Sequence, residues 1–185
     1  ADFHQSSYEA VYHNQWIVQM RKWFRGAAKS IHTNVGNFTH LKENDELRFG
    51  LLIGQNEDHA KRLLSDLQGH MQSNERYIKD FGAQVTYGSW ADGNFECKDG
   101  TYFKGLGIDQ PFRGLRNGAN RVDAASLDDV EDRKIAKNKE RIRERGEKVT
   151  GDLVKAFGKN RGRLIVPNNY IVKGGILDYI EHEMR

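Results

Sequence analysis

Apolar residues recur along the chain with two different spacings, and these spacings predict its secondary structure. Between residues 57 and 73 they lie three or four positions apart with charged residues between them, as in a helix with one buried face. Residues 48–54 form a short apolar run closed by glycine, which is typical of a buried strand. Asp99-Gly100, between segments 95–98 and 101–104, predicts a tight β-hairpin because this dipeptide accepts the positive φ angles of the turn.

The remaining apolar segments extend the alternation of strands and helices along the chain. We expect helices at 6–14, 31–38, 133–157 (with a break near Gly146 or Gly151) and 176–183, and strands at 16–20, 122–127 and 163–167. This alternation favours an α/β domain with a mainly parallel central sheet, into which the hairpin is inserted. Because no repeat or linker divides the chain, we expect one domain over residues 1–185.

Composition narrows the class of protein. Apolar residues make up 37% of the chain and charged residues 30%. No apolar run approaches the roughly 18–20 residues that cross a bilayer, so the sequence argues against a membrane protein. Cys97 is the single cysteine and cannot form an internal disulfide, which favours a reducing compartment. The seven histidines show no zinc-ligand spacing with it, so we predict no such metal site.

Positive charge is concentrated in one part of the chain. Residues 133–163 contain 12 lysines or arginines and 4 acidic residues, whereas the whole chain carries a net charge of only +3. Such a stretch is either the solvated face of a helix or a surface that contacts a polyanion. If it contacts DNA, we expect Arg141, Arg143 and Arg145 to contribute.

The segment that joins the strand at 16–20 to the helix at 31–38 has the chemistry of a phosphate-binding loop. It contains Gly26, Lys29 and Ser30, which suit a backbone cradle, a cation for terminal phosphates and a hydroxyl ligand for Mg²⁺. The N-terminus of the following helix adds a partial positive charge. The full pattern is not met, since Trp23 and Ala28 occupy its two glycine positions; an ordinary basic turn is the competing interpretation.

Asp128 and Asp129 follow the strand at 122–127 and form a second candidate element. In a nucleotide hydrolase, one carboxylate at such a position holds Mg²⁺ and another activates water. An acidic helix cap is the alternative. Both motifs follow the carboxyl ends of predicted strands, where open α/β sheets bind their ligands.

The order of these motifs resembles a known family. The segments Phe24–Ser30 (FRGAAKS) and Leu52–Gln55, the block Gly105–Arg116 (GLGIDQPFRGLR), then Arg121–Asp123 and Leu127–Asp129, are similar to the ATPase domain of the large terminase subunit of tailed phages. The resemblance covers nearly the whole chain. It implies a three-layer fold like that of P-loop NTPases, and ATP hydrolysis with Mg²⁺ that drives double-stranded DNA into a procapsid.

The resemblance also implies roles for individual residues. Asp128 would bind Mg²⁺ together with Ser30, and Asp129 falls where many relatives carry the catalytic glutamate, with Glu131 as a nearby substitute. Arg25 would stabilise the transition state, and Asn168 would sense the γ-phosphate. The nucleotide-binding residues would be Arg25, Gly26, Ala27, Ala28, Lys29, Ser30 and Asn168.

Partners and location follow from the same resemblance. We expect a homo-oligomeric ring on the procapsid, contacts with the portal protein and the small terminase subunit, no membrane, and the bacterial cytoplasm as the compartment. The acidic cluster of the family's C-terminal nuclease domain is missing, so we expect a motor domain cut from a longer chain. Two alternatives stay open: a nucleic-acid-binding module whose loop is inactive, because of Trp23 and Ala28, and another P-loop motor such as a helicase or recombinase, against which the 105–116 block argues.

Overall fold

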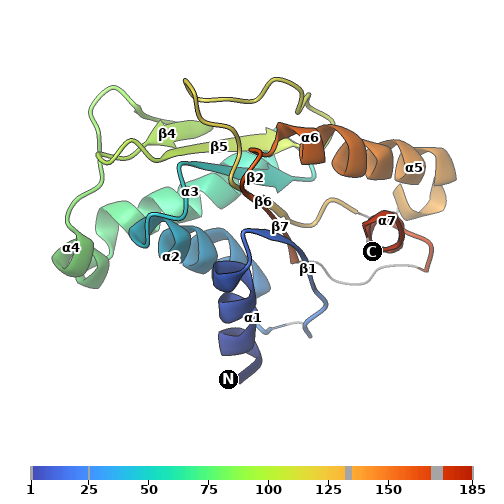
Figure 1. Cartoon of the computed structure of the whole chain (residues 1–185), viewed down its shortest axis with the longest axis horizontal. Helices are drawn as coiled ribbons and strands as arrows, with labels where there is room; N and C mark the ends of the chain where they lie inside the picture. The colour runs from blue at the N-terminus through green and yellow to red at the C-terminus, as the bar shows by residue number, and fades with distance from the viewer. Residues whose placement is uncertain (1, 25, 132–134, 168–172, 185) are drawn as a thin grey trace.

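A seven-stranded, mostly parallel sheet forms the centre of the computed structural model, which describes residues 2–24, 26–131, 135–167 and 173–184 (Figure 1). The strand order is β1-β7-β6-β2-β5-β4-β3. The first five strands in this order pair in parallel, and the last two add antiparallel at one edge. Their bounds are β1 Trp16–Arg21, β7 Gly162–Pro167, β6 Ala124–Leu127, β2 Phe49–Gly54, β5 Tyr102–Gly107, β4 Asn94–Glu96 and β3 Trp90–Ala91. The predicted α/β fold with a mainly parallel sheet is confirmed.

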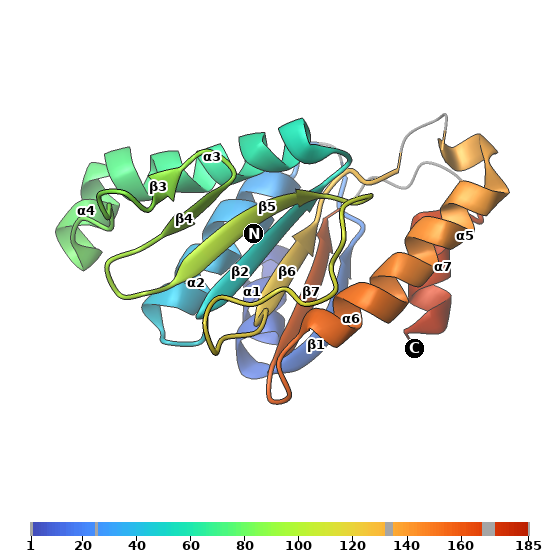
Figure 2. The same cartoon turned by 90° about the horizontal axis from the view of Figure 1, so that it is seen from above.

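Helices lie on both sides of this sheet (Figures 1 and 2). The first half of the chain supplies α1 (Asp2–His13), the π-helix η1 (Ile31–Asn37), α2 (Phe38–Glu43), α3 (Glu57–Ser73) and α4 (Glu75–Phe81). The second half supplies the 3-10 turn η2 (Ile135–Lys137), α5 (Lys139–Glu147), the π-helix η3 (Lys148–Leu153), α6 (Val154–Ala156) and α7 (Ile176–Glu183). In the part of the chain described, no helix is both long enough and apolar enough to cross a membrane.

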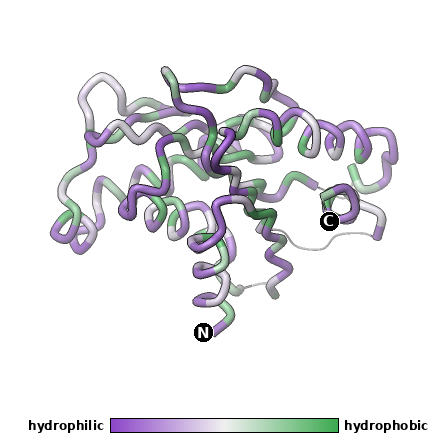
Figure 3. Tube along the Cα trace, in the orientation of Figure 1, coloured by the Kyte–Doolittle hydropathy of each residue, from purple (hydrophilic) through white to green (hydrophobic). Residues whose placement is uncertain are grey.

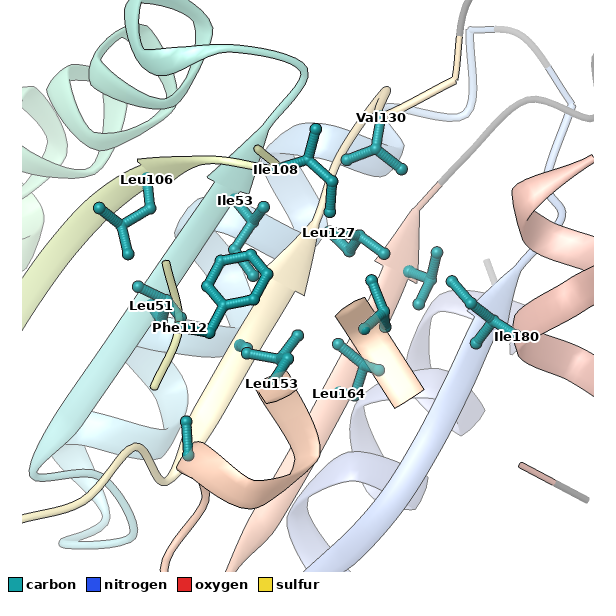
Figure 4. Packing of buried hydrophobic residues seen from close by; sticks show 14 of the residues in the cluster. Leu51, Ile53, Leu106, Ile108, Phe112, Leu127, Val130, Leu153, Leu164 and Ile180 are labelled. Carbon is teal, nitrogen blue, oxygen red and sulfur yellow. The ribbon is translucent and has the colours of Figure 1, made fainter. Parts of the chain in front are cut away.

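The central strands divide the core into two apolar clusters, one on each face. In β2 every residue is buried, and Leu51 and Ile53 pack into one cluster while Leu52 packs into the other, as strand alternation requires. Figure 4 shows Leu51 and Ile53 of β2 in one cluster with Leu127 of the neighbouring β6 and Leu164 of β7. Apolar colour accordingly appears along the central strands of the trace, and hydrophilic colour alternates with it along the helices (Figure 3).

Two glycines allow α3 to begin directly on the sheet. A Cβ atom on Gly54, at the end of β2, would lie 2.7 Å from the backbone nitrogen of Ala60. A Cβ atom on Gly107, at the end of β5, would lie 2.8 Å from the nitrogen of Glu57. Any side chain at either position would push the first turn of α3 away, so the glycines hold this helix close to the carboxyl ends of both strands.

The hairpin around Asp99-Gly100 is present, but it is not a separate insertion. Its arms are β4 and β5, with Phe95 opposite Phe103, and β5 also pairs in parallel with β2. Gly100 has φ +82°, the left-handed conformation expected of this turn. The second arm of the predicted hairpin is therefore one of the parallel strands.

Several predicted boundaries differ from the structure. The helix expected at 6–14 begins at Asp2, the helix expected at 31–38 continues as α2 to Glu43, and α4 was not predicted. The helix expected over 133–157 begins at Lys139 in its described part, where the side chain of Asn138 accepts a hydrogen bond from the backbone of Arg141. It does not break near Gly146 or Gly151; instead its hydrogen-bond pattern widens to that of a π-helix at Lys148.

Candidate functional site

The two predicted motifs lie together at the carboxyl edge of the sheet. The loop follows β1, the acid pair follows β6, and β7 lies between these strands. A pocket of about 290 Å³ opens there, which we call the carboxyl-end pocket; its lining residues are Gly26, Ala28, Lys29, Ser30, Ile31, Asp128, Asp129 and Pro167. Residues about a hundred positions apart in the chain thus meet where parallel α/β sheets bind ligands.

The loop turns through two residues with positive φ angles. Gly26 has φ +90° and Ala28 has φ +51°. The backbone nitrogen of Ala27 donates to the carbonyl oxygen of Phe24 at 3.3 Å, which closes the turn before the helix begins. Ala28 stands at the second glycine position of the phosphate-loop pattern and adopts a glycine-like backbone conformation, so the alanine keeps the shape that the pattern requires.

Lys29 is folded back onto its own loop. Its ammonium nitrogen lies 3.0 Å from the carbonyl oxygen of Trp23 and 3.1 Å from that of Phe24. The lysine therefore bridges the start of the loop while lining the carboxyl-end pocket. An anion in the pocket would compete with these two carbonyl oxygens for the ammonium group.

Asn34 joins the site and was not predicted. Its amide nitrogen donates to the Asp128 carboxylate at 2.7 Å, and both side chains are buried. Ser30 lines the same pocket as this carboxylate and acts to lower its pKa. Ser30 and Asn34 are four residues apart, a spacing that places both side chains on one face of a helix. That spacing was the available sequence signal.

Asp128 is held firmly between strands. Its backbone nitrogen donates to the carbonyl oxygen of Ile53 at 2.9 Å, which extends the pairing of β6 with β2. Burial raises the pKa of its carboxyl group above the ordinary value, and the neighbouring charge of Asp129 raises it further. The nearby Ser30 hydroxyl, the hydrogen bond from Asn34 and the charge of His59, on the first turn of α3, oppose this shift.

The other two predicted acids occupy different environments. Asp129 is exposed, lines the carboxyl-end pocket and has φ +45°. Glu131 is 3% exposed and does not line that pocket. A Cβ atom on Gly175, the residue before α7, would overlap the carboxylate of Glu131, so this side chain packs under the start of that helix.

Trp23 and Arg21 anchor the start of the loop to the N-terminal helix. The Trp23 ring packs edge-on against Phe3 and His4 of α1, with ring centres 5.1 and 4.9 Å apart. The Arg21 guanidinium lies 5.1 Å from the centre of the Trp23 ring and donates to the Thr33 hydroxyl at 2.8 Å. Burial lowers the pKa of Arg21 to about 10. Trp23 therefore serves packing in this loop, at a position where the pattern has glycine.

The residues at the base of the pocket suit a hard divalent cation. The Ser30 hydroxyl and Asp128 carboxylate supply oxygen donors. The side-chain oxygen of Asn34 is buried and has no hydrogen-bond partner among the described residues, but Asn34 does not line the pocket, so it acts on the site through Asp128. The described residues contain no cluster of three or more His, Cys, Asp or Glu side chains arranged for metal binding, so any cation here would rely on this mixed set.

Two predicted site residues, Arg25 and Asn168, lie outside the described residues. Pro167, the last residue of β7 and the neighbour of Asn168 in the chain, does line the carboxyl-end pocket. Gly26, Ala28, Lys29, Ser30, Asp128 and Asp129 are brought together, whereas Ala27 is buried and its carbonyl oxygen lies 3.2 Å from a ring nitrogen of His4.

The structure engages Arg145 within the fold, so this side chain is not free for the predicted DNA contact. Arg145 is 5% exposed, and its guanidinium binds both carboxylate oxygens of Asp109, at 3.0 and 2.6 Å, and the carbonyl oxygen of Val130 at 2.8 Å. It joins α5 to the loops that follow β5 and β6. Arg143 is exposed but pairs with Glu147 at 2.8 Å, which leaves only Arg141 of the three without such a partner among the described residues.

A larger pocket of about 630 Å³ lies beside η1, α1 and α2. Its lining is dominated by apolar and aromatic side chains such as Tyr8, Ile31, Val35 and Phe81. It lacks the loop, the exposed hydroxyl and the acid pair of the carboxyl-end pocket. It is the larger of the two, but the carboxyl-end pocket is the one that brings the two predicted motifs together, so we take that pocket as the candidate site.

Comparison with known proteins adds no family to these observations: no protein-family model matches the chain, and no curated protein matches its sequence.

Proposed function

We propose that this chain is an ATP-hydrolysing motor domain like that of the terminase large subunits it resembles, and that it drives double-stranded DNA into a procapsid. On this proposal its fold is of the P-loop NTPase kind. It works as a ring of copies with the portal protein and the small terminase subunit, in the bacterial cytoplasm.

One observation carries the proposal. The loop of residues 26–30 turns through two positive φ angles and leads into a helix whose Asn34 hydrogen-bonds the buried Asp128, and Ser30 lines the same pocket as that carboxylate. A glycine-like loop supports phosphate binding, because consecutive backbone N–H groups can surround an anion. The hydroxyl and carboxylate that line one pocket support Mg²⁺ binding. An ordinary basic turn and an acidic cap would not require these groups to meet.

In the proposed reaction the residues of this chain bind the nucleotide, orient its phosphates and accept a proton from water. Backbone N–H groups of the loop hold the β- and γ-phosphates, and Lys29 moves from the carbonyl oxygens of Trp23 and Phe24 to the phosphates. Ser30 and Asp128 would hold Mg²⁺, which neutralises charge on the phosphates. Asp129 takes a proton from a water whose oxygen bonds to the γ-phosphorus, while the bond from that phosphorus to the ADP oxygen breaks.

We assign the base to Asp129 and not to Glu131. Asp129 is exposed within the pocket, where water and nucleotide can reach it. Glu131 is buried against Gly175 and would first have to leave the start of α7. The resemblance alone supports the remaining two roles of the proposal, in which Arg25 stabilises the transition state and Asn168 senses the γ-phosphate.

The proposal is tested first by nucleotide binding. Lys29→Ala should weaken the binding of ATP with Mg²⁺, measured by isothermal titration, by about tenfold or more, since it removes a charged phosphate ligand. Lys22→Ala is the matched control, because Lys22 is an exposed lysine that pairs with Glu181 and does not line the pocket. Equal ATP affinity in the wild type and Lys29→Ala would overturn the assignment.

The same proteins then separate binding from hydrolysis. Asp129→Asn should retain ATP binding and lose hydrolysis by about 10²-fold or more, because a positioned base contributes that much. Asp128→Asn should lose hydrolysis as well, and Mg²⁺ should no longer strengthen its binding of ATP. Glu131→Gln should hydrolyse ATP within a few-fold of the wild type; if it alone were inactive, the base would be Glu131.

A nucleic-acid-binding module with an inactive loop is the second candidate. The observation that favours it is the bridge from Lys29 to the carbonyl oxygens of Trp23 and Phe24, which engages the lysine within its own loop. This candidate predicts no ATP binding by the wild type at millimolar nucleotide, so the first titration distinguishes the two.

A further inference from the structure

The opposite edge of the sheet, at the amino ends of the strands, holds a second polar pocket. The connections that precede β2, β6 and β7 lie at this end of the strands (Figure 2). Residues from all three line a pocket of about 360 Å³. We call it the amino-end pocket; its lining residues are Asp45, Arg48, Ala119, Asn120, Arg121, Asp123, Gly158, Lys159, Asn160 and Arg161. Three separate parts of the chain therefore supply four cationic side chains and two amides to one hollow.

The acidic residues around this pocket are engaged in holding its walls. Asp123 accepts hydrogen bonds from the backbone nitrogens of Arg48 and Phe49, at 2.7 and 3.1 Å. Glu46, beside the pocket, pairs with the buried Arg163 at 2.9 Å. Asp45 is the one acid of the pocket paired with one of its cations, Arg48, at a longer 3.3 Å. The carboxylates of Asp123 and Glu46 are therefore bound to groups that hold the fold together.

Two of the four cations are left for a ligand. Arg121 and Lys159 are exposed, and neither makes a hydrogen bond or ion pair with any residue in the described ranges. Arg161 is anchored beside them by Glu46, with 3.8 Å between the charged groups. Arginine, lysine and asparagine side chains that converge without internal partners are typical of contacts to phosphate oxygens of a nucleic-acid backbone.

The position of the pocket separates it from nucleotide chemistry. The amino and carboxyl ends of parallel strands lie at opposite edges of the sheet, so an anion held by Arg121 and Lys159 is remote from Ser30 and Asp128. Lys159 and Arg161 also belong to the basic stretch 133–163, so part of that charge lies here while Arg145 of α5 is buried in an ion pair.

We propose that the amino-end pocket binds the phosphodiester backbone of double-stranded DNA through Arg121 and Lys159. The choice of DNA as the polyanion rests on the function proposed above. The pocket itself rests on the geometry: its volume of about 360 Å³ admits a phosphate with its sugar, and the two cations that line it without partners in the described part of the chain, Arg121 and Lys159, are exposed. Contacts of this kind position DNA and carry no sequence preference.

The test is the salt dependence of DNA binding. Binding of a fluorescein-labelled 30-base-pair duplex is followed by fluorescence anisotropy between 50 and 200 mM NaCl, for the wild type and for Arg121→Gln/Lys159→Gln. Each lost phosphate contact reduces the slope of log K against log salt by about 0.9. Over this fourfold increase in salt, the DNA affinity of the double variant should therefore fall by a factor about 12 times smaller than the factor by which the wild-type affinity falls.

Two matched variants control for net charge and folding. Arg76→Gln/Lys79→Gln removes two exposed cations of α4, outside the basic stretch 133–163, and should leave the slope unchanged. Arg121→Lys/Lys159→Arg keeps both charges and should behave as the wild type. Equal slopes in the wild type and the Gln/Gln variant, equal changes in both Gln/Gln variants, or no duplex binding by the wild type at 50 mM would each overturn the proposal, as would equally effective competition by inorganic phosphate.

Nucleotide titrations on the same proteins keep this proposal distinct from the previous one. Arg121→Gln/Lys159→Gln should bind ATP with Mg²⁺ as the wild type does. If Lys29→Ala leaves ATP binding unchanged while the salt slope falls as expected, the hydrolase proposal fails and the amino-end pocket stands. If ATP binding depends on Lys29 but the slope does not change, the amino-end pocket fails alone.

Discussion

At the scale of single residues, the carboxyl-end pocket depends on two L-residues in an unfavourable backbone conformation. Ala28 has φ +51° and Asp129 has φ +45°. Alanine in this region costs roughly 1–2 kcal/mol, because its Cβ approaches the following carbonyl oxygen. Asp129 tolerates it better, since a short polar side chain can hydrogen-bond locally. Both residues line the pocket, so the backbone conformation that shapes this pocket lowers the stability of the fold.

Replacing Ala28 by glycine tests this strain. Ala28→Gly should raise the free energy of unfolding by up to ~1 kcal/mol, because relief of the left-handed strain exceeds the entropy that glycine adds to the unfolded chain. Ala27→Gly is the control, since Ala27 is buried and is not among the residues with positive φ; it should lower the free energy by about 1 kcal/mol. Urea unfolding at pH 7 measures both. The same sign for the two variants would contradict the strain.

At the scale of elements, one buried lysine joins α2 to the hairpin turn. Lys42 is 3% exposed and lies 2.8 Å from Glu43 and 2.8 Å from Asp99. Burial favours the neutral amine, but hydrogen bonds and charge from Asp99 and Glu43 outweigh it, so the pKa of Lys42 is raised. Burial also acts to raise the pKa of Asp99, yet the bonds from Lys42 and Thr101 leave it lowered. The charged pair thus stabilises the contact between these elements.

Asp99→Asn should remove that stabilisation and spare the turn, because Asn-Gly also forms tight hairpin turns. Since Asp99 is about 40% exposed and therefore partly screened, we expect a loss of about 1 kcal/mol at pH 7. A lowered carboxyl pKa stabilises the fold above its ordinary value of 3.8, and this is lost as the pH falls through the lowered value. The difference between variant and wild type should therefore shrink below pH 3.8 in urea titrations.

The matched control for this change is Asp92→Asn. Asp92 also precedes a glycine in a turn, but it is 77% exposed and lies 3.7 Å from Lys61. Its replacement should change the free energy of unfolding by less than about 0.3 kcal/mol at any pH. A pH-independent loss in Asp99→Asn would instead indicate a damaged turn.

At the scale of the whole molecule, Arg145 connects the long helix to the carboxyl edge of the sheet. Arg145→Ala would leave the buried carbonyl oxygen of Val130 without its donor and separate Asp109 from α5. We expect a loss of about 2–3 kcal/mol in the free energy of unfolding. Arg141→Ala, on the exposed face of the same helix, should change it by less than about 0.5 kcal/mol. Equal effects would contradict the structural role of Arg145.

The sequence pattern predicted a helix or strand well where one face of that element, or the whole element, is buried. The run that forms β2, the one-faced helix α3 and the Asp99-Gly100 turn each carry a signal within a few residues. By contrast, α4 is seven residues long and has a single fully buried residue, Tyr77, so it leaves almost no periodic pattern. The register of β5 against β2 depends on pairing across the chain and could not be predicted locally.

The sequence predicted which residues form the candidate site better than it predicted the contacts that these residues make. The loop and the acid pair were predicted from their chemistry, and the structure brings Ser30 and Asp128 together. The role of Asn34 depends on which side of the helix faces β6, and the burial of Glu131 depends on where α7 begins. Among the basic residues, charge alone could not separate the buried Arg145 from the exposed Arg141, because only packing decides this.

The pairing of β1 with β7 has a consequence for how the chain is synthesised. β1 is complete at Arg21, but its partner in the described sheet comprises residues 162–167. At about 5–20 residues per second, a ribosome needs roughly 7–30 s to supply that partner. During this interval the edge of β1 that pairs with β7 is uncovered, and the loop of residues 26–30 has no completed sheet to hold it beside Asp128. The carboxyl-end pocket is therefore among the last features to form, and if the proposed function holds, nucleotide binding should begin only in nascent chains long enough to include β7.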